Sequence, residues 1–162
     1  MSTALSRATR LALFIVLPVA AMIVPAALAA SHAKVVARTA HNGKLGKTIL
    51  VTTSGRTLYR LSAEHNGKFI CVDKTCLSFW HPLVVARGTK PTGVNGLSVV
   101  RRPTGQMQVT FRGGPLYTFT GDKKAGDANG EGFKDVGVWH AASPQRATTP
   151  APAPSPNPYP YP

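Results

Sequence analysis

The sequence predicts a mainly β fold: one small domain, built from two copies of a β-hairpin-plus-arm repeat and closed by one disulfide. The first observation is that GRTLYRLSAE at residues 55–64 resembles GGPLYTFTGD at residues 113–122. Both place a glycine turn before a Leu-Tyr strand. The second is that apolar and polar residues alternate on each side of these turns, whereas helical periodicity is weak. The third is that the chain has two cysteines, Cys71 and Cys76.

The first 29 residues are expected to be a signal peptide. Two arginines precede an apolar run from Leu11 to Leu28, and Ala27-Leu28-Ala29 offers the small residues that a signal peptidase requires. An uncleaved anchor is the alternative, since the run is nearly long enough to span a bilayer. Pro25 favours cleavage. No cysteine that could be lipidated follows the run, so we expect an exported protein, secreted or in the extracytoplasmic cell envelope and not lipid-anchored.

The remaining chain divides into three parts. Residues 30–44 are polar without clear periodicity and predict a flexible lead-in. Residues 45–142 are enough for one small core and hold both repeats, at about 48–86 and 106–142. Residues 143–162 contain eight prolines, which lack the N–H donor that a helix or sheet needs. They predict a disordered Pro-rich tail that acts as a spacer or, alternatively, as a segment held by a partner's aromatic groove or a wall polymer.

The first repeat begins with a hairpin pattern. Thr48–Thr52 alternates into a turn at Ser54-Gly55, and Thr57–Leu61 alternates out of it. A polar loop follows and ends at Trp80. Within this loop, Lys74–Phe79 predicts a turn or two of helix.

The second repeat has the same layout. Gln106–Phe111 leads to two glycines, and Pro115–Phe119 continues to a polar loop that ends at Trp139. Between the repeats, Leu97–Val100 predicts a further short strand. In each hairpin the leucine, Leu58 or Leu116, is expected to face away from its tyrosine neighbour. The expected core anchors are Phe79, Trp80, Phe119 and Trp139.

The two cysteines predict a structural disulfide, because two nearby cysteines usually pair in an oxidising compartment. A metal site would need further cysteines or histidines at suitable spacings, and haem attachment would need C-x-x-C-H. We therefore expect no cofactor.

At these residues the chain resembles a family of bacterial secreted or lipoprotein-type repeats of unknown function, marked by a Tyr-x-(Phe/Trp/Tyr)-x-x-Asp motif. The second copy matches in full with Tyr117, Phe119 and Asp122. The first copy has Tyr59, but Leu61 replaces the aromatic residue and Glu64 replaces the aspartate.

Further features of the family recur over residues 47–144. The two cysteines are followed by Trp80-His81-Pro82-Leu83, where the family usually has Trp-Pro-Pro-Leu. The loop at 126–132 also resembles the family's. The resemblance implies an exported, duplicated small domain and no particular activity. Family members are often lipidated, and this chain departs from them in having no cysteine for that modification.

Two sets of residues are candidates for binding a metal ion. Asp127, Asn129 and Glu131 stand at alternate positions, as at the start of a calcium loop, but Val138 occupies the position where such a loop ends in a carboxylate. A plain turn explains these residues as well. His81 and His140 follow the two tryptophans and would need to approach one another to bind a transition metal.

Catalytic candidates are few. Glu64 and Asp122 could accept backbone N–H bonds and pin the loops that follow, or act as an acid/base pair, and the first role is favoured. Neither G-x-S-x-G nor H-E-x-x-H occurs. We expect no enzyme activity.

The charge points to an anionic partner. Of 19 Lys and Arg, two lie in the leader, and the remaining 17 less 6 acidic residues give +11. Since the basic residues are scattered, a solvated basic surface is the ordinary interpretation. The sequence predicts a monomeric, non-enzymatic envelope-associated or secreted protein, without a transmembrane span after cleavage. It would bind anionic cell-wall or envelope polymers rather than specific nucleic acid. The alternative is an extracytoplasmic small-ligand or metal-binding protein.

Overall fold

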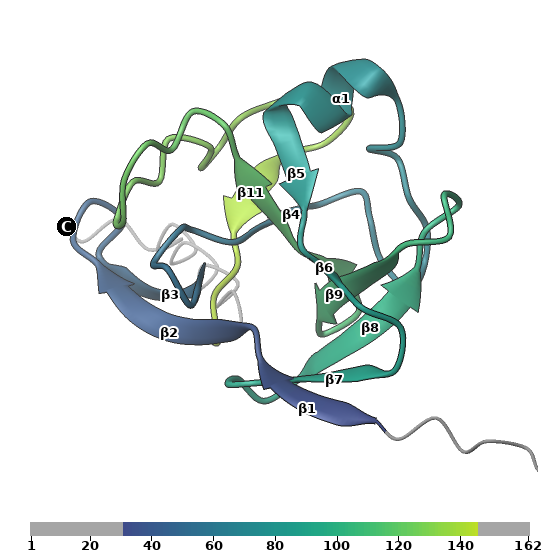
Figure 1. Cartoon of the computed structure of the whole chain (residues 1–162). Helices are drawn as coiled ribbons and strands as arrows, with labels where there is room; N and C mark the ends of the chain where they lie inside the picture. Colours follow the sequence, from purple (N-terminus) through teal and green to yellow (C-terminus); the bar gives the residue numbers. More distant parts are fainter. Residues whose placement is uncertain (1–30, 146–162) are drawn as a thin grey trace, which may run out of the picture.

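The computed structural model describes residues 31–145, so the predicted signal peptide and residues 146–162 of the predicted tail lie outside it. The described chain is a single, mainly β domain with one short helix (Figure 1), which confirms the predicted fold class. The elements are β1 His32–Val35, β2 Ala37–Asn42, β3 Lys47–Thr52, β4 Tyr59–Leu61, α1 Lys74–Phe79, β5 Trp80–Pro82, β6 Val84–Val85, β7 Thr89–Thr92, β8 Leu97–Arg101, β9 Met107–Phe111, β10 Gly114–Pro115, β11 Tyr117–Phe119 and β12 Trp139–Ala141. No described helix is long and apolar enough to cross a membrane.

The strands form four small sheets. A four-stranded antiparallel sheet runs in the order β12-β4-β11-β5. A second sheet places β10, β6 and β8 around β9. The antiparallel pair β2-β3 and the parallel pair β1-β7 complete the fold. The two predicted hairpins thus bend between sheets. β3 and β9 lead into their turns from two different sheets, whereas β4 and β11, after the turns, belong to the same third sheet.

The N-terminal part of the domain corrects one expectation. Residues 30–44 were expected to be a flexible lead-in, but β2 pairs with β3 over six residues, from Ala37 opposite Thr52 to Asn42 opposite Lys47. Val36 and Ala37 are buried. The sequence hides this strand because its two buried residues, Ala37 and Asn42, are small or polar, so apolar alternation is faint.

The core has two parts. The aromatic core contains Tyr59, Trp80, Tyr117 and Trp139, together with Ile49, Val51, Leu61, Cys71 and Ala141. The aliphatic core contains Val36, Ala37, Leu50, Leu58, Val109, Phe111, Leu116 and Ala142. Leu58 and Leu116 therefore face away from their tyrosine neighbours, as their alternation predicts.

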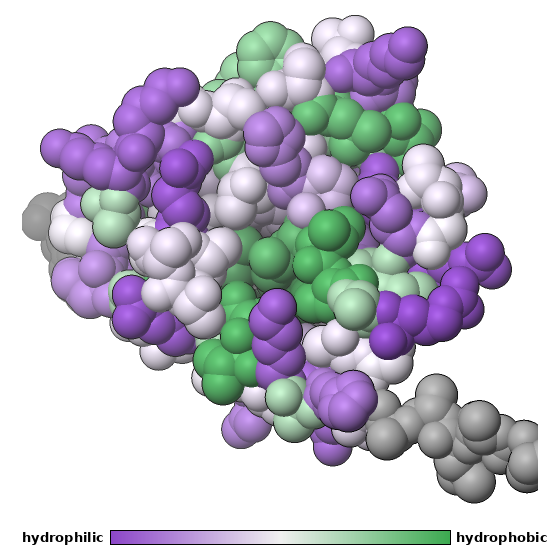
Figure 2. Space-filling view, viewed as in Figure 1, coloured by the Kyte–Doolittle hydropathy of each residue, from purple (hydrophilic) through white to green (hydrophobic). Residues whose placement is uncertain are grey.

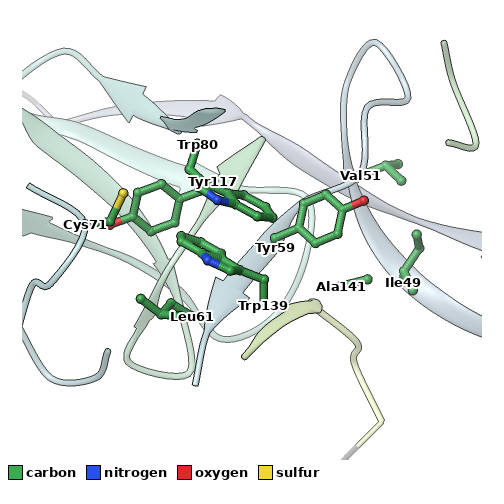
Figure 3. Packing of buried hydrophobic residues seen from close by; sticks show 9 residues of the cluster. All are labelled: Ile49, Val51, Tyr59, Leu61, Cys71, Trp80, Tyr117, Trp139 and Ala141. Carbon is green, nitrogen blue, oxygen red and sulfur yellow. The ribbon is translucent and has the colours of Figure 1, made fainter. Parts of the chain in front are cut away.

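Aromatic stacking organises the first of these cores. The rings of Trp80 and Trp139 stack with centroids 3.7 Å apart and planes inclined by 6° (Figure 3). Phe119 is partly buried and stacks on Trp80, with ring centroids 4.5 Å apart. Phe79, in contrast, is 52% exposed. It is the last residue of α1, a helix with no buried residue, so its prediction as a core anchor was wrong.

The arms of the two predicted repeats exchange partners. β5, the arm of the first copy, pairs with β11 of the second, while β12 pairs with β4. Hydrogen bonds match in the same way: Leu83 N–H donates to Leu116 O at 2.9 Å, and Ala142 N–H donates to Leu58 O at 2.8 Å. The duplication stays a prediction from sequence, and these matched bonds are the structural feature that supports it.

Candidate functional site

The residues of the repeated motif meet across the centre of the molecule. Tyr59 and Tyr117 lie directly opposite one another in β4 and β11. The Tyr59 hydroxyl donates to Asp122 Oδ2 at 2.8 Å, and the Tyr117 hydroxyl donates to Glu64 Oε2 at 2.9 Å. Each tyrosine therefore binds the carboxylate that ends the other copy of the motif.

The same carboxylates hold the loops that follow them. Glu64 Oε1 accepts the N–H groups of Ile70 and Cys71, at 2.6 and 2.8 Å. Asp122 Oδ1 accepts the N–H of Asn129 at 2.9 Å. Both carboxylates are buried, so the contacts that they make are internal to the protein.

The tyrosine hydroxyls in this network remain protonated. Burial, followed by the hydrogen bond to Asp122, raises the pKa of Tyr59 far above its ordinary value. Burial and the nearby charge of Glu64 likewise raise the pKa of Tyr117. A general acid or base works best with a pKa near the working pH. These groups instead act as fixed hydrogen-bond donors, which suits a structural role.

A buried arginine joins the network, and sequence reasoning missed it. Arg102 donates through Nη1 to the Tyr117 hydroxyl at 3.1 Å and to Gln108 Oε1 at 2.5 Å, and through Nη2 to Cys71 O at 2.7 Å. Its guanidinium also lies 4.9 Å from the centre of the Phe69 ring. In the sequence it is one of two adjacent arginines beside a turn, a pattern that predicts exposure rather than burial.

The calcium-loop candidates do not converge. Asp127 Oδ2 accepts the N–H groups of Lys123 and Lys124, and Asn129 Nδ2 donates to Gly121 O. Glu131 accepts from Ala141 N and pairs with His140 Nδ1. Within residues 31–145 no three His, Cys, Asp or Glu side chains are grouped as metal ligands would be. Asp127 and Asn129 therefore make hydrogen bonds within the loop, whereas Glu131 ties the loop to β12.

The two histidines lie far apart. His81 belongs to β5 and His140 to β12, the two edge strands of the sheet, with β4 and β11 between them. Three strand spacings of about 4.8 Å separate them by about 14 Å. His140 is instead held by Glu131 at 2.9 Å. Burial raises the pKa of Glu131, but the hydrogen bonds from His140 and Ala141 outweigh it and lower that pKa overall.

The predicted disulfide is present and borders a pocket. Cys71 and Cys76 are bonded, with their Cα atoms 5.4 Å apart. A pocket of about 390 Å³ lies between the segment around α1 and the loop before β12. The residues that line it are Ile70, Cys71, Asp73, Thr75, Cys76, Phe79, Trp80, Phe133, Lys134, Asp135 and Val136.

Basic residues gather around a second location, at the turn between β3 and β4. A Cβ on Gly55 would lie 2.9 Å from Ala125 Cβ and 3.7 Å from Arg38 Nη2, so the loop after β11 contacts this turn. We define the basic patch as the five cationic residues around this contact: Arg38, Lys44, Arg56, Lys123 and Lys124. Figure 2 shows hydrophilic side chains crowding the side of the molecule where this loop meets the end of β2.

One carboxylate lies within the basic patch, and it is already engaged. Asp127 is buried, and its bonds from Lys123 N and Lys124 N, with the charges of Lys124 and Lys44, lower its pKa. The guanidinium of Arg56 donates from Nη2 to Phe119 O at 3.4 Å, whereas its buried Nε has no partner among the described residues. The patch thus presents positive charge with little internal compensation.

Comparison with known proteins gives one match. Residues 98–143 match a family described as a secreted repeat of unknown function, which supports an exported protein. The matched segment covers β8 to β12 and so contains the second copy of the motif. No curated protein and no solved structure matches the chain.

Proposed function

We propose that this protein is a non-enzymatic exported protein that binds an anionic polymer of the cell wall or envelope through its basic patch. The match to a secreted family supports the location. The patch supports the class of partner, because an anionic chain outside the cell meets a surface that carries excess positive charge.

The observation that carries the proposal is the lack of ion pairing. Among the Lys and Arg side chains of residues 31–145, Lys47 alone lies within 4 Å of a carboxylate, that of Glu131 at 3.6 Å. Three of the six acidic residues, Glu64, Asp122 and Asp127, are buried. Surface cations therefore have few acidic neighbours to neutralise them, and an external polyanion would supply the missing partners.

Two variants that lose the same number of charges test whether the anionic polymer binds at the basic patch. The patch variant carries Arg38→Gln, Lys123→Gln and Lys124→Gln. The control variant carries Lys34→Gln, Arg87→Gln and Lys90→Gln, which are exposed residues at or beside β1 and β7. Both lose three charges. Binding to long-chain polyphosphate and to poly-glutamate is measured by fluorescence anisotropy, with neutral dextran as the blank.

The patch variant should bind about tenfold more weakly than the control. Three exposed ion contacts at roughly 0.5 kcal/mol each account for that factor. Binding of the unmodified protein should vanish at a few hundred millimolar salt, where the screening length falls to a few ångströms. Equal weakening by both variants would contradict a defined patch, and salt-insensitive binding would contradict the electrostatic basis.

A further inference from the structure

The pocket beside the disulfide is surrounded by exposed apolar side chains. The described residues include six large hydrophobic side chains that are exposed. Three of them line this pocket: Phe79, Phe133 at 47% and Val136 at 61% exposed. A fourth, Val72, adjoins the disulfide. Figure 2 shows hydrophobic surface in the region where Figure 1 places α1. Such a gathering of apolar side chains on a small domain indicates a contact surface.

Three of the residues that line the pocket are aromatic: Phe79, Trp80 and Phe133. Trp80 is only 1% exposed and is held in place because it stacks on Trp139 and on Phe119. The Phe133 ring meets Trp80 edge-on, with centroids 6.0 Å apart. Phe79, at the end of α1, also lines the pocket. Grooves between aromatic rings of this kind bind proline-rich segments, whose extended backbone loses little entropy on binding.

The charges around the pocket differ in sign from those of the basic patch. Asp73 and Asp135 line it with a single lysine, Lys134, although the chain as a whole is strongly basic. An anionic polymer would be repelled by these carboxylates. The pocket therefore suits an apolar segment that carries no acidic residue.

We propose that this pocket holds the chain's own Pro-rich segment, residues 146–162. That segment contains seven prolines and two tyrosines and no acidic residue, which matches the aromatic walls and the two carboxylates. Its length suffices: 17 residues at about 3.1 Å per residue reach about 53 Å, more than the width of a domain of this size. Binding there covers Phe79 and Phe133. This contact is independent of the anion binding proposed above.

Nuclear magnetic resonance of the full chain tests the contact. In one variant the seven prolines and two tyrosines of residues 146–162 are replaced by serine and glycine at unchanged length. The replacement should shift the amide signals of Phe79, Phe133 and Val136 and the indole signal of Trp80. Signals of Val35 and Val84, exposed hydrophobic residues elsewhere on the domain, should stay in place.

A second comparison separates the pocket from general changes. In a Phe79→Ser, Phe133→Ser background the tail replacement should no longer shift the Val136 and Trp80 signals, whereas in a Val35→Ser, Val84→Ser background it should. A peptide of residues 146–162, added to the tail-replaced chain, should bind at least tenfold more weakly when both phenylalanines are changed. Shifts that grow with protein concentration would show the tail of a second copy in the pocket, which also supports the assignment.

Two results would overturn it. One is a tail replacement that leaves the pocket signals unchanged at every concentration. The other is equal peptide affinity for the tail-replaced chain with and without Phe79 and Phe133. The first measurement leaves every residue of the pocket unchanged, so it remains decisive if the double variant folds poorly.

Discussion

At the scale of single residues, the two copies of the motif bind one another. The tyrosine of each copy binds the carboxylate of the other. The carboxylate of the degenerate first copy therefore only has to reach the tyrosine of the second. Glu64 does this with a longer side chain that also accepts two backbone N–H bonds. Leu61 lies opposite Trp139, whereas Phe119 lies opposite Trp80. Leu61 belongs to the aromatic core and Phe119 packs against that core, so an apolar side chain suffices at this position of the motif.

Asp122→Ala should destabilise the domain by about 2–4 kcal/mol. The Tyr59 hydroxyl and the Asn129 N–H would both lose a buried partner, and each unsatisfied group costs about 1–3 kcal/mol. Urea unfolding followed by tryptophan fluorescence measures the change. Asp135→Ala is the control, since this aspartate is exposed and its loss should change stability by less than about 0.5 kcal/mol. Equal stability of the two variants would contradict the pinning role.

Double-mutant cycles should show which carboxylate each tyrosine depends on. Tyr59→Phe combined with Asp122→Asn should give a coupling energy of about 0.5–3 kcal/mol, because the two side chains share a hydrogen bond. Tyr59→Phe combined with Glu64→Gln should be closer to additive, although both belong to the same copy of the motif. Stronger coupling within a copy than between copies would contradict the exchanged arrangement.

At the scale of elements, local patterns predicted what local forces determine. The α1 segment and the strand at Leu97 were expected from sequence and are present. The opposite faces of Leu58 and Tyr59 follow from strand alternation. The exchange of β5 and β12 could not be predicted, because alternation fixes which side a residue faces and not which strand it pairs with. Arg102 was missed for a similar reason: its partners lie 6, 15 and 31 residues away.

The loop after β11 should lose stability in acid through Asp127. Hydrogen bonds from Lys123 N and Lys124 N lower its folded-state pKa below the ordinary value. A depressed carboxyl pKa gives stability that is complete above the unfolded pKa of about 3.9 and is lost as the pH falls through the folded value. Asp127→Asn cannot titrate, so its melting temperature should fall less steeply between about pH 4 and pH 2. Identical slopes for the two proteins would refute this role.

At the scale of the whole molecule, the two candidate surfaces have opposite character. The basic patch gathers cations from β2, the turn before β4 and the loop after β11, while the pocket gathers apolar side chains and two carboxylates. Neither could be located from sequence, because the basic residues are scattered along the chain and Phe79 and Phe133 are 54 residues apart. What the sequence did supply was their chemistry, a high positive charge and a Pro-rich segment.

The position at which the domain begins gives a last test of the whole fold. All of β1 is exposed. The free energy of unfolding of a chain that starts at Val36 should therefore lie within about 1 kcal/mol of that of a chain that starts at Ser31. A chain that starts at Gly43 loses β2, which pairs with β3 over six residues, and it loses Val36 and Ala37 from the aliphatic core. It also loses the bond from Asn42 Nδ2 to Gly126 O, 3.0 Å long, which ties β2 to the loop after β11.

Exposing the core edge and the unpaired strand should remove most of the 5–15 kcal/mol that stabilises a typical domain. Circular dichroism with urea titration should find the chain that starts at Gly43 largely unfolded. If the chain from Gly43 folded as stably as the chain from Val36, residues 30–44 would be the dispensable lead-in that their composition suggests.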